Sequence, residues 1–160
     1  MKKRVTPYAM IIVLLISISC QKINNSQKKG FLIKGVYSEE DVNFFTNFFK
    51  QMEEAVRTED LEKSISFYSK DFMSDEGINL EQVKENTEFV YEHYDNINYK
   101  MSNIIVTLKN DKAVSIDNFE YSAEPVKESL KPLEYKGTER IYWKKEGDEW
   151  KIINWVVSEE

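Results

Sequence analysis

The chain has 160 residues, a formal net charge of −6 and an aromatic content of 13%, which suits one domain with one hydrophobic core. This acidic balance argues against general nucleic-acid binding, because phosphate contacts need concentrated lysine and arginine. There is one cysteine and one histidine, and no cluster of residues at metal-ligand spacing. The sequence therefore predicts no disulfide, no metal site and no cofactor.

The first twenty residues have the pattern of an export signal. Lys2, Lys3 and Arg4 precede residues 5–19, which carry no charge and are fewer than the ~20 residues that span a membrane. The only cysteine, Cys20, ends this run. A plain secretory signal with Cys20 as a bystander is one interpretation, but it leaves an exported chain with an unpaired reactive thiol.

Residues 17–20, Ser-Ile-Ser-Cys, resemble the lipobox of bacterial lipoproteins, although leucine is common where Ser17 stands. In that family the cysteine receives a diacylglyceryl group and becomes the first residue of the mature chain. The resemblance implies that residues 1–19 are a cleaved signal peptide and that residues 20–36 are the lipidated Cys20 and a polar tether. It also implies an exported protein of the cell envelope, anchored to a membrane through the lipid on Cys20.

Three helices are predicted next. Ser38 and Asp41 form a capping-box-like start for a helix that ends near Arg57. Its apolar stripe consists of Val42, Phe45, Phe48, Phe49, Met52 and Val56. Glu59 and Asp60 suit the first turn of a short second helix. Asn79, with Gln82 three residues later, predicts the start of a third helix.

From Asn98 the apolar period changes to two, which predicts strands. A loop at residues 110–112 would place Val106 opposite Ile116, with a bulge near Asp117-Asn118. Pro125 and Pro132 bracket a loop, and a final hairpin follows. The predicted fold class is α+β: three N-terminal helices packed on a curved antiparallel sheet of about four strands, in a single domain over residues 37–160.

The final hairpin predicts two different faces. A turn at Gly147-Asp148 would set Trp143 opposite Ile152 on the face that covers the helices. The other face would carry four side chains, which form a candidate interaction surface: Arg140, Tyr142, Ile153 and Trp155. This face is apolar for a free surface. Its alternatives are scattered exposed aromatics, cover by the tether, or a contact with a second copy or a protein partner.

The order of these motifs resembles the nuclear transport factor 2-like (cystatin-like, cone-shaped) superfamily. The matching segments are the aromatic first helix, "AVRTEDLEKSISFYSKDFM" at residues 55–73 and "GDEWKIINW" at residues 147–155. An unrelated α+β meander is the alternative. The resemblance implies a conical pocket between helices and sheet. Some members are enzymes of the ketosteroid isomerase, scytalone dehydratase or limonene-epoxide hydrolase type, and many are binding or accessory domains.

No residue spacing identifies a catalytic set. Asp71 suits a structural turn, His93 lies on a helix flank, and Arg57 and Arg140 should face water. Candidate pocket residues combine apolar bodies with polar tips: Tyr68, Tyr91, Tyr94, Trp143, Trp150 and Asn154. We therefore expect a membrane-anchored exported lipoprotein whose domain is a non-enzymatic small-ligand-binding or accessory module. The alternatives are an isomerase or hydrolase that uses the pocket, and a structural or protein-interaction protein of the envelope.

Overall fold

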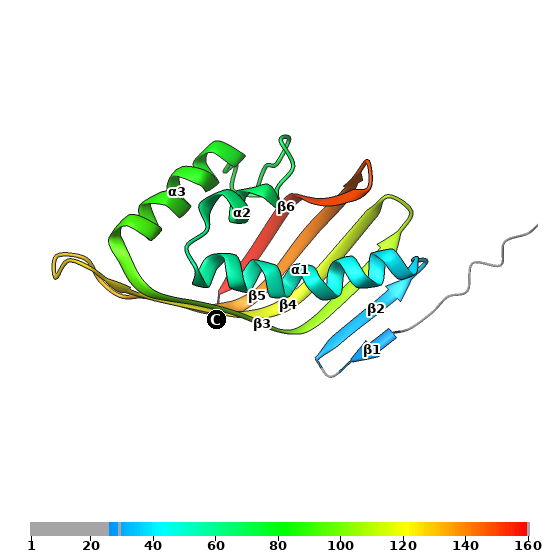
Figure 1. The fold of residues 1–160 in the computed structure, drawn as a ribbon, viewed down its shortest axis with the longest axis horizontal. Helices are drawn as coiled ribbons and strands as arrows, with labels where there is room; N and C mark the ends of the chain where they lie inside the picture. The colour runs from blue at the N-terminus through cyan, green and yellow to red at the C-terminus, as the bar shows by residue number, and fades with distance from the viewer. Residues whose placement is uncertain (1–25, 29, 160) are drawn as a thin grey trace, which may run out of the picture.

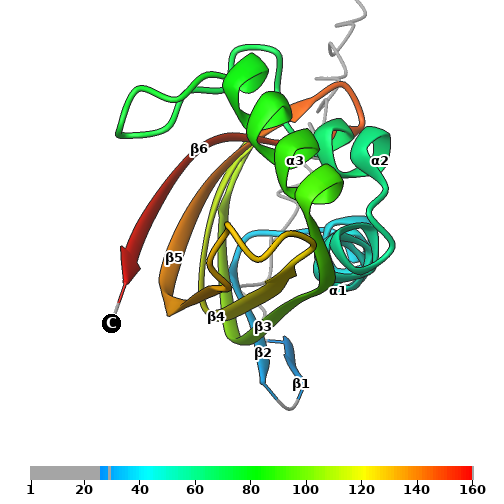
Figure 2. The same cartoon turned by 90° about the vertical axis from the view of Figure 1, so that its left-hand side faces the viewer.

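The computed structural model describes residues 26–28 and 30–159, in which three helices cover one face of a curved sheet (Figures 1 and 2). The elements follow in the order β1 (Ser26–Lys28), β2 (Phe31–Gly35), α1 (Glu39–Arg57), α2 (Leu61–Ser66), α3 (Leu80–His93), β3 (Tyr94–Lys109), β4 (Lys112–Pro125), β5 (Leu133–Glu146) and β6 (Glu149–Glu159). The predicted fold class and its three helices are confirmed. The predicted signal peptide and Cys20 lie outside the described residues.

The sheet contains the four predicted strands, β3 to β6, and two further strands, β1 and β2, which come earlier in the chain and extend the sheet beyond β3. Its order is β1 to β6, and every neighbouring pair is antiparallel except the parallel pair β2 and β3. The prediction of a tether is wrong for Phe31–Gly35, because this segment buries Ile33 completely. Gly35 (φ +101) allows the close approach to β3, since a Cβ there would lie 2.1 Å from the carbonyl oxygen of Leu108.

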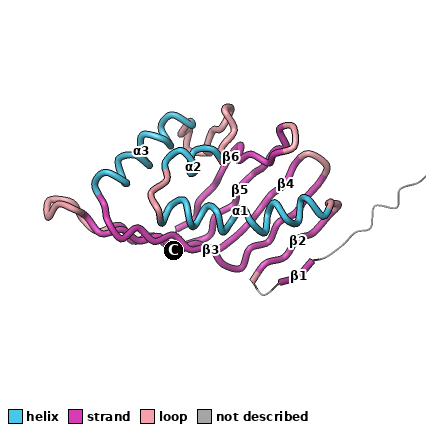
Figure 3. The backbone as a smooth tube through the Cα atoms, viewed as in Figure 1, coloured by secondary structure: helices cyan, strands magenta, loops and turns pink. Residues whose placement is uncertain are grey.

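Helix α1 lies across the inner face of the sheet, as the tube view shows (Figure 3). Its buried side chains include Phe45, Phe48 and Phe49, at the helical spacing that the sequence shows. The rings of Phe45 and Phe48 meet the indole of Trp143 edge to face, with centroids 5.3 and 4.6 Å apart. The core is therefore an aromatic layer between α1 and strand β5.

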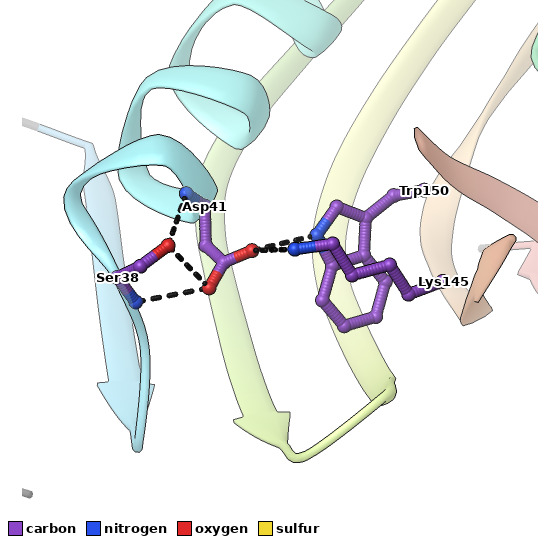
Figure 4. A network of polar contacts seen from close by, with 4 residues as sticks. All are labelled: Ser38, Asp41, Lys145 and Trp150. Atoms are coloured by element: carbon purple, nitrogen blue, oxygen red, sulfur yellow. Dashed lines mark hydrogen bonds and ion pairs between the residues drawn. The ribbon is translucent and has the colours of Figure 1, made fainter. Parts of the chain in front are cut away.

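The start of α1 is tied to the last hairpin through Asp41 (Figure 4). Ser38 and Asp41 form the predicted capping box. The second carboxylate oxygen of Asp41 accepts hydrogen bonds from Trp150 Nε1 at 2.9 Å and Lys145 Nζ at 3.2 Å. Burial alone would raise the pKa of Asp41, but the hydrogen bonds from Ser38, Trp150 and Lys145 outweigh it and lower the pKa.

The β3–β4 register differs from the prediction by one residue. A two-residue turn at Asn110 and Asp111 pairs Val106 with Ser115 rather than with Ile116. Asn110 adopts a left-handed backbone (φ 58), which asparagine tolerates better than most residues.

An irregularity does lie beside Asp117, as expected, but the extra residue is on β3: the register shifts between Ser102 and Ile105, which pair with Asn118 and Ile116. Strand β4 itself alternates without interruption, and its pairing with β5 is continuous. Asp117 therefore faces the helices and is buried.

The β5–β6 register follows the prediction only near the turn. Trp143 pairs with Ile152 as expected, but Tyr142 then pairs with Asn154 and Ile141 with Trp155. Ile153 is the extra residue, and its carbonyl accepts a hydrogen bond from the Met73 amide at 3.2 Å. A one-residue shift moves every later side chain to the other face. The predicted outer position of Trp155 is therefore wrong.

Candidate functional site

A cavity of about 480 Å³ lies between the helices and the inner face of the sheet. Apolar and aromatic side chains make most of its wall: Phe48, Met52, Val56, Tyr68, Ile78, Val83, Val90, Met101, Phe119, Tyr121, Leu133, Tyr135, Ile141, Ile152, Trp155 and Val157. The polar contributors are Asn86 and Thr87 from α3, Tyr99 from β3 and Glu139 from β5. An apolar lining with few polar groups is typical of small-molecule sites.

The most polar point of the cavity wall is the carboxyl group of Glu139. Three adjacent strands, β3, β4 and β5, carry the residues that surround it. The hydroxyl of Tyr99 donates a short hydrogen bond to Glu139 Oε1. Asp117 lies directly opposite Glu139 in the β4–β5 ladder, and the two residues are only 1% and 7% exposed. Two buried carboxyl groups therefore face each other beside the cavity.

A shared proton would relieve the repulsion between these two opposed carboxyl groups. No donor among the described residues reaches either carboxyl oxygen of Asp117, so Asp117 and Glu139 can hydrogen-bond to each other only if one of them is protonated. Loss of hydration and the neighbouring Glu139 raise the pKa of Asp117 to about 9. Burial also raises the pKa of Glu139, although hydrogen bonds from Tyr99 and Asp117 oppose this change. Both carboxyl groups are therefore easier to protonate in the folded protein than in the unfolded chain.

The tyrosines at this point of the cavity are neutral hydrogen-bonding groups. Burial and the nearby Glu139 raise the pKa of both Tyr99 and Tyr68 above the usual value for a phenol. The ring of Tyr68 packs edge to face against Phe72 and Trp155, with centroids 5.0 and 5.6 Å apart. The phenols can therefore donate hydrogen bonds, but they add no charge to the cavity.

The structure places one of the six predicted pocket residues, Tyr68, in the cavity wall. Tyr91 donates to or accepts from Ser64 at 3.0 Å and lines a smaller hollow that shares Val56 and Val90 with the cavity. Tyr94 belongs to a separate buried cluster with Ile97 and Ala123. Tyr94 leaves the predicted helical stripe because its backbone is already extended at the α3–β3 junction.

The other three predicted pocket residues have structural partners. Trp143 and Trp150 belong to the core, and their Nε1 atoms donate to Ser115 and Asp41. The Asn154 amide donates to the Met73 carbonyl at 2.6 Å and to Asp75, because the bulge at Ile153 turns Asn154 away from the helices. The prediction that these three residues line the cavity is wrong.

Of the residues that the sequence analysis placed outside the pocket, Arg140, Tyr142, Ile153, Asp71 and His93 are absent from the cavity wall, whereas Trp155 is part of it. Arg140 is exposed, and Tyr142 and Ile153 are half-buried, whereas Trp155 lines the cavity. Asp71 is exposed and outside the cavity wall. The imidazole of His93 stacks on Phe89 at 4.3 Å and is not part of the cavity wall.

Sequence reasoning missed Tyr99, Asp117 and Glu139. A signal for Glu139 was present, because it stands two residues before Ile141 and four before Trp143 on a strand whose inner face those residues define. Asp117 has the same relation to Ser115 and Phe119, which share its face. The wrong turn length in the preceding hairpin concealed this alternation.

Two absences hold for the part of the chain that the structure describes. No group of three or more His, Cys, Asp or Glu side chains there could hold a metal ion. None of the helices in that part is both long enough and apolar enough to cross a membrane.

The fold and its cavity define an NTF2-like domain. Residues 43–155 match the family described as the Cds6 C-terminal NTF2-like domain, and the chain belongs to this family. This finding confirms the superfamily that the sequence motifs suggested. A comparison with curated proteins found no match.

Solved structures with the same fold come from several bacteria. Bd1075 of Bdellovibrio bacteriovorus has a TM-score of 0.64 and 19% identity over 79% of this chain, which spans 46% of that structure. A candidate scytalone dehydratase of Novosphingobium aromaticivorans has a TM-score of 0.67 and 12% identity over 75% of this chain and 84% of its own. An NTF2-like protein of Cytophaga hutchinsonii has a TM-score of 0.62 and 18% identity over 78% of this chain and all of its own. Identities this low show a common fold only.

Proposed function

We propose that this domain binds an apolar small molecule in the cavity and acts as a non-enzymatic binding or accessory module. The observation that carries the proposal is a cavity of about 480 Å³ with apolar walls and a single buried acidic group, Glu139, at its wall. Its volume falls in the range of about 300–1,000 Å³ that is typical of ligand pockets. Such a lining supplies affinity through apolar burial and orientation through one or two hydrogen bonds.

A matched pair of α3 variants tests this proposal. Val90 lines the cavity, whereas its neighbour Phe89 is 49% exposed. We expect Val90→Trp to fill the cavity and weaken binding of 2-naphthalenemethanol at least tenfold in equilibrium dialysis, while Phe89→Trp binds like the wild type. Thermal unfolding of both variants checks that they fold. Equal binding by both variants, or no binding by the wild type, would contradict the proposal.

A second candidate function is general acid–base catalysis at the same site. It is favoured by the convergence of Glu139, Asp117 and Tyr99, because a buried carboxyl with a raised pKa is suited to proton transfer near neutral pH. Glu139 could accept a proton from a carbon next to a carbonyl. The breaking C–H bond would leave its electron pair on an enolate, whose oxygen could accept a hydrogen bond from Tyr68.

Hydrogen exchange separates this candidate from binding alone. The α-hydrogens of 2-tetralone can be followed by NMR in D₂O with the wild type, with Glu139→Gln and without protein. Catalysis predicts faster exchange with the wild type only. Exchange no faster than in buffer would remove this candidate and leave binding as the function.

We further propose that the protein is exported and anchored in the cell envelope through a lipid on Cys20. The support is the basic start of the chain, the uncharged residues 5–19 and the lipobox-like residues 17–20. With an acidic domain, attraction to anionic headgroups is weak, so the acyl chains would supply the attachment.

We also propose that the outer sheet face, with Arg140, Tyr142 and Ile153 but without Trp155, contacts a second copy of the chain. The support is that Ile105 and Ile116, paired on β3 and β4, are both 36% exposed on the sheet. Analytical ultracentrifugation of the wild type and Ile116→Lys tests it, and a wild type that stays monomeric at high concentration would contradict it.

A further inference from the structure

The charge of the cavity wall is one-sided. Among the residues that the structure describes, Glu139 is the one acidic side chain in the wall, and no lysine, arginine or histidine lines the cavity. The other titratable groups of the wall are phenols, and burial raises the pKa of Tyr68, Tyr99 and Tyr121. A ligand inside therefore meets a negative or neutral wall and finds no cation.

The hydrogen bonds around Glu139 leave it able to accept another. An ionised carboxyl accepts about four hydrogen bonds. Tyr99 supplies one from β3, and Asp117 supplies a second from β4 when it carries the shared proton. Asp117 stands on β4, the neighbour of β5, and Tyr99 stands on β3, one strand further along the sheet, so the orientation of Glu139 is set before a ligand arrives. Because Glu139 is also part of the cavity wall, its remaining acceptor sites can serve a ligand.

We propose that the ligand of this cavity is an apolar molecule that carries an amine or a hydroxyl group and no acidic group. The inference rests on the proposed binding function and adds the chemical class of the ligand. A hydroxyl or an ammonium group gains a charge-assisted hydrogen bond to Glu139. A carboxylate, sulfate or phosphate would lie beside Glu139 in a cavity with mostly apolar walls and no cationic side chain, which is unfavourable.

Three ligands with one skeleton test this selection. They are 2-naphthylmethylamine, 2-naphthalenemethanol and 2-naphthoic acid, which differ in the group that would face Glu139. We expect equilibrium dialysis at pH 7 to show that the amine and the alcohol bind at least tenfold more tightly than the acid. This ratio matches the usual strength of one hydrogen bond to a charged group.

Variants at the carboxyl pair assign the selection to Glu139. Glu139→Gln preserves shape and removes the charge, so the amine should lose about tenfold or more in affinity and the disadvantage of the acid should shrink. The double variant Glu139→Gln with Asp117→Asn provides a second test, because two amides in these positions can hydrogen-bond to each other. Glu134→Gln, on the same strand but exposed and outside the cavity wall, is the matched control and should retain the wild-type preference.

The outcomes distinguish this inference from the proposed function. If all three ligands bind within about twofold of each other, or if both carboxyl-pair variants keep the wild-type preference, the selection by Glu139 is wrong and binding in the cavity still stands. If the wild type binds none of the three ligands, the proposed binding function fails and the inference falls with it.

Discussion

Replacing Asp117 with asparagine should stabilise the protein at neutral and mildly alkaline pH. The substitution keeps the shape of a side chain that is 1% exposed and removes its ability to ionise. In the wild type the pKa of Asp117 rises from 3.8 in the unfolded chain to about 9 in the folded protein. The groups that act on it are Glu139 of β5, directly opposite, and Glu53 of α1.

The sign of the pH effect follows from proton linkage. A carboxyl group with a raised pKa is more protonated in the folded state than in the unfolded state. Its cost to the free energy of folding is therefore absent below pH 3.8 and grows with pH until the pH passes the folded pKa near 9. At pH 7 this corresponds to as much as ~4 kcal/mol, at about 1.36 kcal/mol for each pH unit above 3.8. The asparagine of the variant would carry no such penalty, and its amide could still donate to Glu139.

Urea denaturation of the wild type and Asp117→Asn between pH 4 and pH 9 measures this effect. We expect the free energy of unfolding of the variant to exceed that of the wild type by an amount that increases from pH 5 to pH 8. Asp95→Asn, at an exposed position of β3, is a control for the substitution itself. Parallel stability curves for the wild type and Asp117→Asn over this range would refute the reasoning about the buried pair.

Three other predictions test the core, the helix start and the lipid anchor. Phe49→Ala removes a ring that is 3% exposed and should lower the free energy of unfolding by roughly 3–5 kcal/mol. Phe89→Ala, at an exposed position, is the control and should lower it by under about 1 kcal/mol. An equally small loss for Phe49→Ala would mean that this face of α1 is not the buried one. Asp41→Asn should destabilise the protein by about 1–3 kcal/mol at pH 7. Because the pKa of Asp41 is lowered in the folded protein, the stability difference between wild type and variant in urea denaturation should vanish as the pH falls below that pKa. A difference that persists at the lowest pH would contradict this prediction. In detergent partitioning the wild type should enter the detergent phase and Cys20→Ala should stay in the aqueous phase. A variant that partitions like the wild type would exclude lipidation at Cys20.

Local signals predicted the helices and the identity of the four long strands. Ser38 with Asp41 and Asn79 with Gln82 form the capping boxes that the sequence indicates, since these contacts join residues three apart and need no distant partner. The apolar stripe of α1 and the turn at Gly147 are equally local. Together with the order of the motifs, they were enough to recognise the superfamily and to expect a cavity between helices and sheet.

Which side chains line the cavity depends on contacts between segments that are far apart in the chain. Strand register is decided by turn length and by bulges, and an error of one residue moves a side chain from the inner face to the outer face. The two-residue turn at Asn110 sets a register in which Asp117 lies on the inner face. The extra residue Ile153, whose carbonyl accepts a hydrogen bond from the Met73 amide, shifts the register of β6 so that Trp155 also lies on the inner face.

Local patterns in the sequence were therefore enough to predict the fold class, the starts of the helices and the burial of the α1 aromatic stripe, because each depends on residues close together in the chain. The meeting of Tyr99, Asp117 and Glu139 beside an apolar cavity follows instead from how distant strands pair. These residues lie on three strands, and their separation along the chain hides the relation between them. Pairing of the strands in one register brings them together, and burial then raises the pKa of both carboxyl groups.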